Sequence, residues 1–311
     1  MGKRIAVFAD GTWNTPTQAH PTNVIRLKNV TLDQGDDNIE QKIYYDEGVG
    51  ASGTWWEKLL GGTSGYDLDE KILDCYKFLV ENHEPDDQIF LFGFSRGAYT
   101  VRSLVGLIRN CGLLNKENSH MAEEAMEMYR NRSQDAHPNS SGALGFKEQY
   151  SKTADIWFMG VWDTVGALGI PSRYIGRLFN RRYEFHDMKL SGSVKHAYHA
   201  LSVDERRGAF APSVWTTAGT ANRDLEQVWF AGDHSEVGGG SSDASLPDVA
   251  FMWMMYKAQA CGLEFDQVAI GNNISPSPFG KSDADVKGIY KFLTRYTRRV
   301  GKADYAQQAV H

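Results

Sequence analysis

The sequence predicts an α/β fold: a mostly parallel sheet with helices on both faces and lid-type insertions. Short continuous apolar runs, typical of strands buried on both faces, alternate with amphipathic helical stretches over much of the chain. This alternation favours an open sheet with right-handed crossovers. Several of the runs end in an aspartate or a histidine, and the carboxyl ends of parallel strands are where ligands and catalytic groups collect.

The composition fits one α/β domain spanning residues 1–311. Hydrophobic residues make up 41% of the chain and aromatic residues 12%, enough for an ample core. The formal net charge is −6, so the composition does not indicate a basic surface for nucleic acid or anionic lipid as the main partner. The three cysteines lack CxxC spacing, so we expect buried thiols in a reducing compartment. No apolar run approaches the ~20 residues of a membrane span, and the first run is too short for a signal peptide.

The first part of the chain predicts five elements. Strands are expected at 4–9, 41–45 and 89–92, and helices at 21–31 and 68–80. The loop after the second strand carries Gly48-x-Gly50-x-x-Gly53, which matches a dinucleotide fingerprint in its letters. Trp55 and Trp56 follow instead of a good helix, so we favour a loop that lines the mouth of a site.

The second part contains two expected insertions. In residues 115–153 the alternation of strand and helix patterns stops, apart from one helix at 121–129, and residues 170–195 form a second inserted segment. We expect both to lie over the site as lid or wall segments. Between and after them we expect strands at 155–162 and 226–231, a helix or helix end at 196–207 and a buried helix at 245–255. After Cys261 the chain turns polar, and we expect it to wrap the surface.

The stretch around Ser95 predicts the most specific local structure. The apolar run Ile89 to Phe92 leads through Gly93-Phe-Ser95-Arg-Gly97 into a helical stripe. A nucleophile elbow needs glycine on both sides of the serine, because the serine backbone is strained and the helix approaches the strand closely. The motif between a strand and a helix therefore indicates an elbow rather than an ordinary turn.

Three predicted strand ends carry Ser95, Asp163 and His234, in the chain order of α/β-hydrolase triads. A serine hydroxyl needs an imidazole to take its proton, and the imidazole needs a carboxylate to fix its tautomer. We therefore predict Ser95 as nucleophile, His234 as base and Asp163 as acid. Asp204 and Asp233 are the next candidates for the acid.

The oxyanion of such a reaction needs two backbone N–H donors. The residue after the serine, Arg96, supplies one, and the loop after the first strand supplies the other from Gly11 or Thr12. An Asp-Gly turn without catalytic meaning is an equally good interpretation of that loop.

A second interpretation is a metal-dependent phosphoesterase. Asp10, Asp163, Asp233 and His234 all follow predicted strands and could chelate a metal ion, with Thr12 or Ser95 attacking phosphorus. Asp10 and Asp233 could also hold a structural calcium ion beside a serine mechanism. His196 and His199 lie at i and i+3 of the expected helix, but without a third ligand we favour structural histidines. A third interpretation is a hydrolase-like scaffold used only for binding.

Six motifs along the chain resemble the successive blocks of one family, the α/β-hydrolase-like catalytic domain of type VI secretion phospholipase effectors. They are Ala9-Asp-Gly-Thr-Trp-Asn14, Tyr44-Tyr-Asp-Glu-Gly-Val-Gly50, Phe92-Gly-Phe-Ser-Arg-Gly-Ala-Tyr99, Gly160-Val-Trp-Asp-Thr-Val-Gly166, His199-Ala-Leu-Ser-Val-Asp-Glu-Arg206 and Trp229-Phe-Ala-Gly-Asp-His-Ser-Glu-Val-Gly-Gly-Gly240. The resemblance implies the same triad of Ser95, Asp163 and His234.

The resemblance also implies ester hydrolysis, with phospholipids as the best-known substrate class. We therefore expect a lipase, phospholipase or related esterase that requires no cofactor. The expected partner is the ester or phospholipid substrate, with peripheral contact to a membrane left open and no nucleic acid. The expected location is the cytoplasm, with delivery from the cell by a non-Sec secretion system as an alternative.

Overall fold

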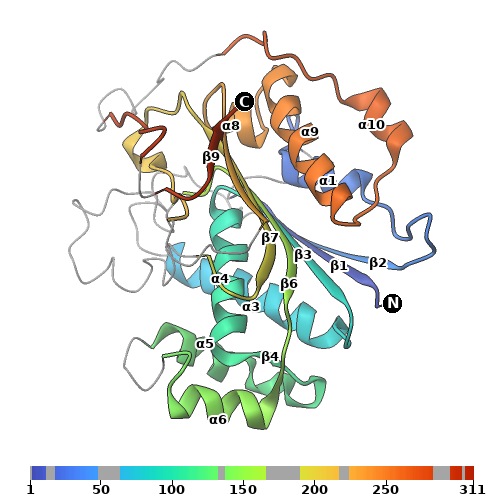
Figure 1. Ribbon diagram of the computed structural model, residues 1–311, viewed down its shortest axis with the longest axis vertical. Coiled ribbons are helices and arrows are strands. Elements are labelled where there is room, and N and C mark those ends of the chain that lie inside the picture. The colour runs from blue at the N-terminus through green and yellow to red at the C-terminus, as the bar shows by residue number, and fades with distance from the viewer. Residues whose placement is uncertain are drawn as a thin grey trace.

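The computed structural model describes residues 2–11, 18–47, 64–131, 137–165, 190–216, 224–282, 295–302 and 305–311. A seven-stranded sheet runs through it in the order β2-β1-β3-β6-β7-β8-β9 (Figure 1). All six pairings in this sheet are parallel. Its strands are β1 (Arg4–Ala9), β2 (Gln41–Asp46), β3 (Gln88–Phe94), β6 (Ile156–Trp162), β7 (Val194–Ser202), β8 (Asp224–Phe230) and β9 (Gln308–Val310). The predicted α/β class is thus confirmed.

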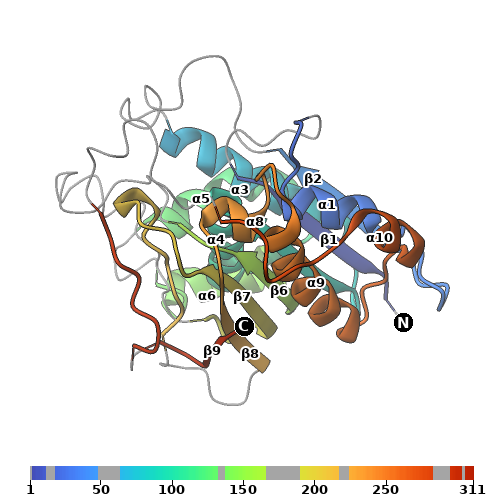
Figure 2. The same cartoon turned by 90° about the horizontal axis from the view of Figure 1, so that it is seen from above.

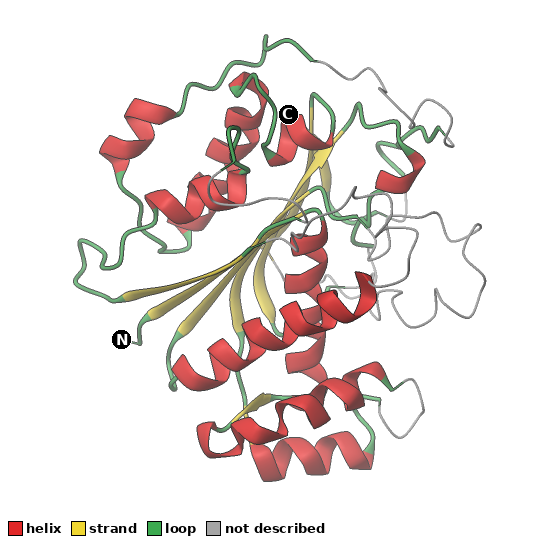
Figure 3. Cartoon of the chain, turned by 180° about the vertical axis from the view of Figure 1, so that it is seen from behind, coloured by secondary structure: helices red, strands yellow, loops and turns green. Residues whose placement is uncertain are grey.

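Helices cover both faces of the sheet (Figure 3). One face packs on α3 (Ser64–Asn82) and α4 (Arg96–Cys111), and the other packs on α1 (Asn23–Val30) and α9 (Ser245–Ala260). The alternation in β1 explains this, since Ile5 and Val7 join the first apolar core while Ala6 and Phe8 join the second. The remaining elements are β4 (Leu113–Leu114), η1 (Lys116–Met121), α5 (Ala122–Arg130), α6 (Ser141–Tyr150), β5 (Ser151–Lys152), η3 (Gly208–Phe210), α8 (His234–Gly238) and α10 (Gln267–Asn273).

The strand order creates a switch point between β1 and β3. The chain leaves β1 for β2 on one side and returns through α3 to β3 on the other. Crevices outside the carboxyl ends of strands at such a point are the usual ligand sites of open α/β sheets. α4 begins directly after β3, so its first residues lie at this edge.

Residues 196–207 do not form the expected helix. Most of this stretch belongs to β7 (Val194–Ser202), a strand between β6 and β8. A short apolar run of this kind cannot be assigned to helix or strand by periodicity alone. In a strand, positions i and i+3 face opposite sides of the sheet, so His196 and His199 do not point at a common site. His196 is half-buried and His199 has no exposed surface.

The described part of residues 115–153 does not form a lid over the carboxyl edge. It contains the expected helix as α5 and also α6, where a loop was expected. α5 buries Ala122, Ala125, Met126 and Tyr129 in the core shared with α3 and α4. Figure 1 shows α5, α6 and β4 at the far end of α4 from the carboxyl edge. Of the other expected lid, residues 166–189 lie outside the described residues, as do residues 48–63 of the glycine-rich loop.

The chain after Cys261 does more than wrap the surface. It forms α10, and its last residues add β9 to the sheet beside β8 (Figure 2). Arg298, in the same C-terminal segment, lies in the interior, and its side chain has no exposed surface. The polar composition of this segment therefore gave no indication of the strand β9 or of the buried charge of Arg298.

The described residues contain no helix that is long and apolar enough to cross a membrane. The cysteines are unpaired thiols, with Cys75 and Cys111 buried and Cys261 partly buried. Burial raises the pKa of the Cys111 thiol to about 12, so this thiol is held in its unreactive protonated form.

Candidate active site

Ser95 occupies a strained turn between β3 and α4. It is the residue before α4 and has φ 57° and ψ −117°, a conformation that residues with a Cβ rarely adopt. The flanking glycines are needed for close approach. A Cβ on Gly97 would lie 2.0 Å from the carbonyl oxygen of Ala9, and one on Gly93 would lie 2.6 Å from that of Gly97. Only glycine at these positions lets α4 pack against the ends of β1 and β3.

The structure brings together the three side chains of the predicted triad. Ser95 Oγ lies 2.9 Å from His234 Nε2. His234 Nδ1 lies 2.6 Å from Asp163 Oδ2. An ionised carboxylate can only accept, so Nδ1 carries the imidazole proton and Nε2 is left as the acceptor for the serine hydroxyl.

Neighbouring elements position these three groups. Asp163 directly follows β6, which pairs with β3, the strand before Ser95. His234 is the first residue of α8, which begins one short turn after β8. Asp233 caps this helix by accepting from the N–H groups of Ser235 and Glu236, and the Glu236 side chain accepts in return from the Asp233 N–H. This capping box fixes where α8, and with it His234, begins.

Two aromatic rings enclose the imidazole. The His234 ring centre lies 4.6 Å from that of Phe94 and 4.8 Å from that of Phe210. Gly238 lets Phe94 reach this position, because a Cβ there would lie 1.9 Å from the Phe94 ring. His234 is therefore only 6% exposed, and packing restricts its ring orientation.

Asp163 is an ionised carboxylate in the interior. It has no exposed surface, and its Oδ1 accepts from the Ser202 N–H at 3.0 Å. Burial alone would raise the pKa of Asp163, but the charge of Arg298 and the hydrogen bond with His234 outweigh burial and hold that pKa well below its usual range. The acid can therefore orient the imidazole as a carboxylate at every pH near neutrality.

Arg298 is a part of this site that the sequence analysis missed. Its guanidinium donates to both oxygens of Asp163, Nη1 to Oδ1 and Nη2 to Oδ2, the latter at 2.9 Å. Nη1 also donates to the Ser202 carbonyl at 2.8 Å, and Nη2 to the Phe210 carbonyl at 2.7 Å. Nothing in the run Thr297-Arg-Arg-Val300 distinguishes this arginine from Arg299, so no local sequence signal could have identified it.

The expected oxyanion donors have different outcomes. Arg96 is the first residue of α4, directly after Ser95. The Gly11 N–H donates to Asp10 Oδ1 at 2.7 Å, so in this conformation it is not directed at a substrate. Thr12 lies outside the described residues.

The carboxylates considered as metal ligands have other hydrogen-bond partners. Asp10 Oδ2 accepts from the hydroxyl of Thr22 at 2.5 Å and from that of Tyr45 at 3.0 Å. Asp233 caps α8. Asp204, considered as an alternative acid and not as a metal ligand, accepts at Oδ2 from the Gly232 N–H at 2.8 Å. Within the described ranges, no three His, Cys, Asp or Glu side chains converge as a metal ion would require. The part of the chain that the structure describes thus offers no set of three such ligands for the phosphoesterase interpretation.

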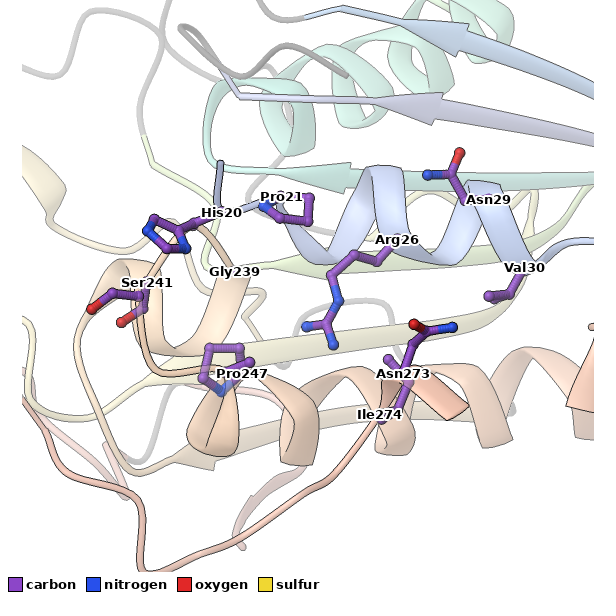
Figure 4. A pocket seen from close by; sticks show the side chains of 13 residues that line it. His20, Pro21, Arg26, Asn29, Val30, Gly239, Ser241, Pro247, Asn273 and Ile274 are labelled. Atoms are coloured by element: carbon purple, nitrogen blue, oxygen red, sulfur yellow. The ribbon is translucent and has the colours of Figure 1, made fainter. Parts of the chain in front are cut away.

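A cavity of about 460 Å³ lies between α1 and the segments after α8 and α10, and Ser95, Asp163 and His234 are not among its lining residues (Figure 4). Arg26 extends into it from α1, toward Pro247 and Asn273. The guanidinium is paired with Asp248, donates to Asn23 Oδ1 at 3.1 Å and lies 5.2 Å from the centre of the Phe251 ring. The charge of Arg26 is therefore already paired within the protein.

The fold and the site define a class: an α/β protein whose parallel sheet carries, at its carboxyl edge, a serine, a histidine and an aspartate in one hydrogen-bonded chain. The sequence model of the family "T6SS, Phospholipase effector Tle1-like, catalytic domain" matches residues 3–257. The chain belongs to this family, and the resemblance seen in the six motifs is confirmed.

Individual relatives are longer than this chain. An uncharacterized protein of Saccharomyces cerevisiae, YEL023C, is 34% identical over 235 residues, which cover 69% of this chain and 33% of that protein. An uncharacterized protein from Pseudomonas aeruginosa has a similar fold, with a TM-score of 0.52, 17% identity and coverage of 89% of this chain and 49% of that one. The Tle1 effector bound to the VgrG spike gives a TM-score of 0.43 at 18% identity over 78% of this chain and 52% of that one. The chain thus spans a third to a half of these proteins.

Proposed function

We propose that this chain is a serine ester hydrolase that cleaves carboxylic esters through an acyl-enzyme. The observation that carries the proposal is the hydrogen-bonded chain from Ser95 Oγ through His234 to Asp163, with distances of 2.9 and 2.6 Å. Its location supports the same conclusion, because Ser95 directly precedes α4 in a strained turn, as a nucleophile elbow requires.

In the proposed mechanism, His234 Nε2 takes the hydroxyl proton of Ser95 while Ser95 Oγ bonds to the ester carbonyl carbon. Asp163 holds the imidazole in the required tautomer and stabilises its positive charge. The proton then passes from Nε2 to the leaving alkoxide, so that the alcohol departs and the acyl group stays on Ser95. Water then gives a proton to the same imidazole as it attacks the acyl carbon. The bond to Ser95 Oγ breaks, the imidazole returns the proton to Ser95 Oγ, and the carboxylic acid leaves.

The oxyanion is stabilised, in this proposal, by the N–H of Arg96 and by a second donor from the loop after β1. Gly11 can serve only if its N–H leaves Asp10 when the substrate binds, since it donates there at 2.7 Å. Losing one such donor typically costs about 3 kcal/mol of transition-state stabilisation. Thr12 remains the other candidate.

The proposed substrate class is phospholipids, because the family is named for phospholipase effectors. The match of a yeast protein of unknown function indicates that the domain is not confined to bacterial effectors. The proposal therefore concerns the hydrolytic chemistry first. Delivery from the cell by a non-Sec system and peripheral contact with a membrane remain subordinate proposals.

The experiment that tests the proposal is an ester panel with and without EDTA. Short p-nitrophenyl esters and phosphatidylglycerol or phosphatidylethanolamine vesicles are offered to the wild type, to Ser95→Ala and to Ser141→Ala, an exposed control on α6. We expect hydrolysis by the wild type and the control, none above background by Ser95→Ala, and no effect of EDTA. Hydrolysis that survives Ser95→Ala would contradict the mechanism. Loss of activity in EDTA would favour the metal interpretation, and a fully inactive wild type would favour a binding scaffold.

A further inference from the structure

Arg298 belongs to a part of the chain that the family match does not include. The match ends at residue 257, forty-one residues before Arg298. The segment around Arg298 is held by backbone contacts, since the Tyr296 N–H donates to the Arg206 carbonyl at 2.8 Å and Arg295 forms an antiparallel bridge with Arg207. The C-terminal segment therefore docks beside the turn that carries Phe210.

The guanidinium joins three separate elements at the site. Its planar fork matches the two oxygens of Asp163, which follows β6, and the same two nitrogens reach the carbonyls of Ser202 in β7 and Phe210 in η3. Bidentate charged contacts of this kind fix the rotation of a carboxylate as well as its charge. Phe210 in turn packs on the imidazole.

We propose that Arg298 is a positioning residue of the catalytic centre, supplied by the C-terminal segment to hold Asp163 Oδ2 against His234 Nδ1. This inference rests on the proposed hydrolase function. Arg298 acts through Asp163 and Phe210 rather than on the substrate. Its guanidinium also places a second positive charge against the carboxylate that stabilises the imidazolium.

Two effects follow from this arrangement. First, without the fork the carboxylate can rotate, and misplacement of about 1 Å in a catalytic array can cost on the order of 10²-fold in rate. Second, loss of the nearby cation favours the protonated imidazole, which cannot act as base. The acid limb of the rate profile then moves to higher pH.

The ionisable groups around His234, apart from Arg298 itself, are the same in the Arg298 variants as in the wild type. Glu205 accepts from the His234 N–H at 3.4 Å and is paired with Arg207 at 2.5 Å. Asp233 precedes His234, with Arg207 4.0 Å away, and Glu236 accepts from the Asp233 N–H. On the side of Asp163, His199 accepts from the Thr164 N–H at 3.2 Å. Any shift of the acid limb can therefore be assigned to the change at Arg298.

The test compares Arg298→Gln and Arg298→Lys with Arg299→Gln, a matched control that removes an exposed arginine next in sequence. For each variant, kcat and KM on a p-nitrophenyl ester are measured from pH 5 to 9, with thermal unfolding as the check of folding. For Arg298→Gln we expect kcat to fall about 10²-fold, KM to change much less than kcat, and the acid limb to move to higher pH. For Arg298→Lys we expect a smaller loss of kcat, about tenfold, with the limb unchanged because the charge remains. The control should match the wild type.

Three results would overturn the proposal: a folded Arg298→Gln with wild-type kcat and acid limb, equal losses in Gln and Lys variants with the limb unmoved, or the same loss in the control. If Arg298→Gln does not fold, the kcat of Arg298→Lys tests the proposal instead, and an unchanged kcat in that variant would overturn the positioning role. Failure of the proposed function is distinguishable, since the wild type would then show no Ser95-dependent hydrolysis at any pH.

Discussion

The strained backbone of Ser95 predicts that glycine at this position gives a more stable protein than alanine does. Its φ of 57° and ψ of −117° cost a residue with a Cβ about 1–3 kcal/mol, whereas glycine adopts them without this strain. Ser95→Gly removes the strain but adds about 0.5–1 kcal/mol of backbone entropy lost on folding. Central values leave Ser95→Gly more stable than Ser95→Ala by about 1 kcal/mol. Both variants lose the hydrogen bond to His234, so that term cancels.

Thermal unfolding measures the difference. At about 2.1 cal/mol/K of unfolding entropy per residue, a chain of 311 residues gains about 1.5 °C in Tm for 1 kcal/mol. The control pair is Glu148→Gly and Glu148→Ala on the exposed face of α6, where glycine should be the less stable by about 1 kcal/mol. Both Ser95 variants should lack activity. Glycine below alanine in Tm at position 95, as at 148, would refute the strain argument.

Three further predictions concern the surroundings of the triad. Asp163→Asn should lower kcat by about 10⁴-fold, because the amide can hold the imidazole in the wrong tautomer. The KM for the ester should change by no more than a few fold. An unchanged kcat would mean that another residue is the acid. Gly238→Ala would bring a Cβ to 1.9 Å from the Phe94 ring, so we expect urea unfolding to show a loss of about 1–3 kcal/mol of stability. We also expect a lower kcat. Burial and the nearby Arg102 lower the pKa of His199 to about 3, so the unfolded state binds one proton more between about pH 3 and 6.5. The free energy of unfolding should therefore fall as pH drops through that window, by up to about 1.4 kcal/mol per pH unit. His199→Gln, whose side chain can still accept from the Thr164 N–H, should reduce this dependence of stability on pH. An unaltered dependence would refute the assignment to His199.

The strands that flank the site could be predicted from the sequence because buried parallel strands carry a strong local signal. The runs at 89–92 and 155–162 became β3 and β6, and their ends carry Ser95 and Asp163. His234 was placed near the end of the predicted strand at 226–231, and the structure adds that the capping box of Asp233 and Glu236 sets where α8 begins. Which chemistry the three groups perform stays a proposal.

Features that depend on tertiary contacts could not be predicted. β7 was expected as a helix or helix end, because periodicity alone does not assign a short, mostly buried run such as His196 to Ser202, and only its pairing with β6 and β8 decides for a strand. The segment at 115–153 was expected as a lid, whereas its helix α5 packs on α3 and α4. Arg298 is the clearest case, since its partner Asp163 is 135 residues away in the sequence and burial of a charge leaves no trace in local composition.

The account depends on a serine oxygen that is made nucleophilic by one imidazole. The most direct measurement is the rate of covalent labelling by a fluorophosphonate, with the adduct mapped by peptide mass spectrometry in the wild type, Ser95→Ala and His234→Ala. We expect a single adduct on Ser95, none in Ser95→Ala, and labelling slowed at least about 10³-fold in His234→Ala. Labelling of another residue, or an unchanged rate without the imidazole, would contradict the account.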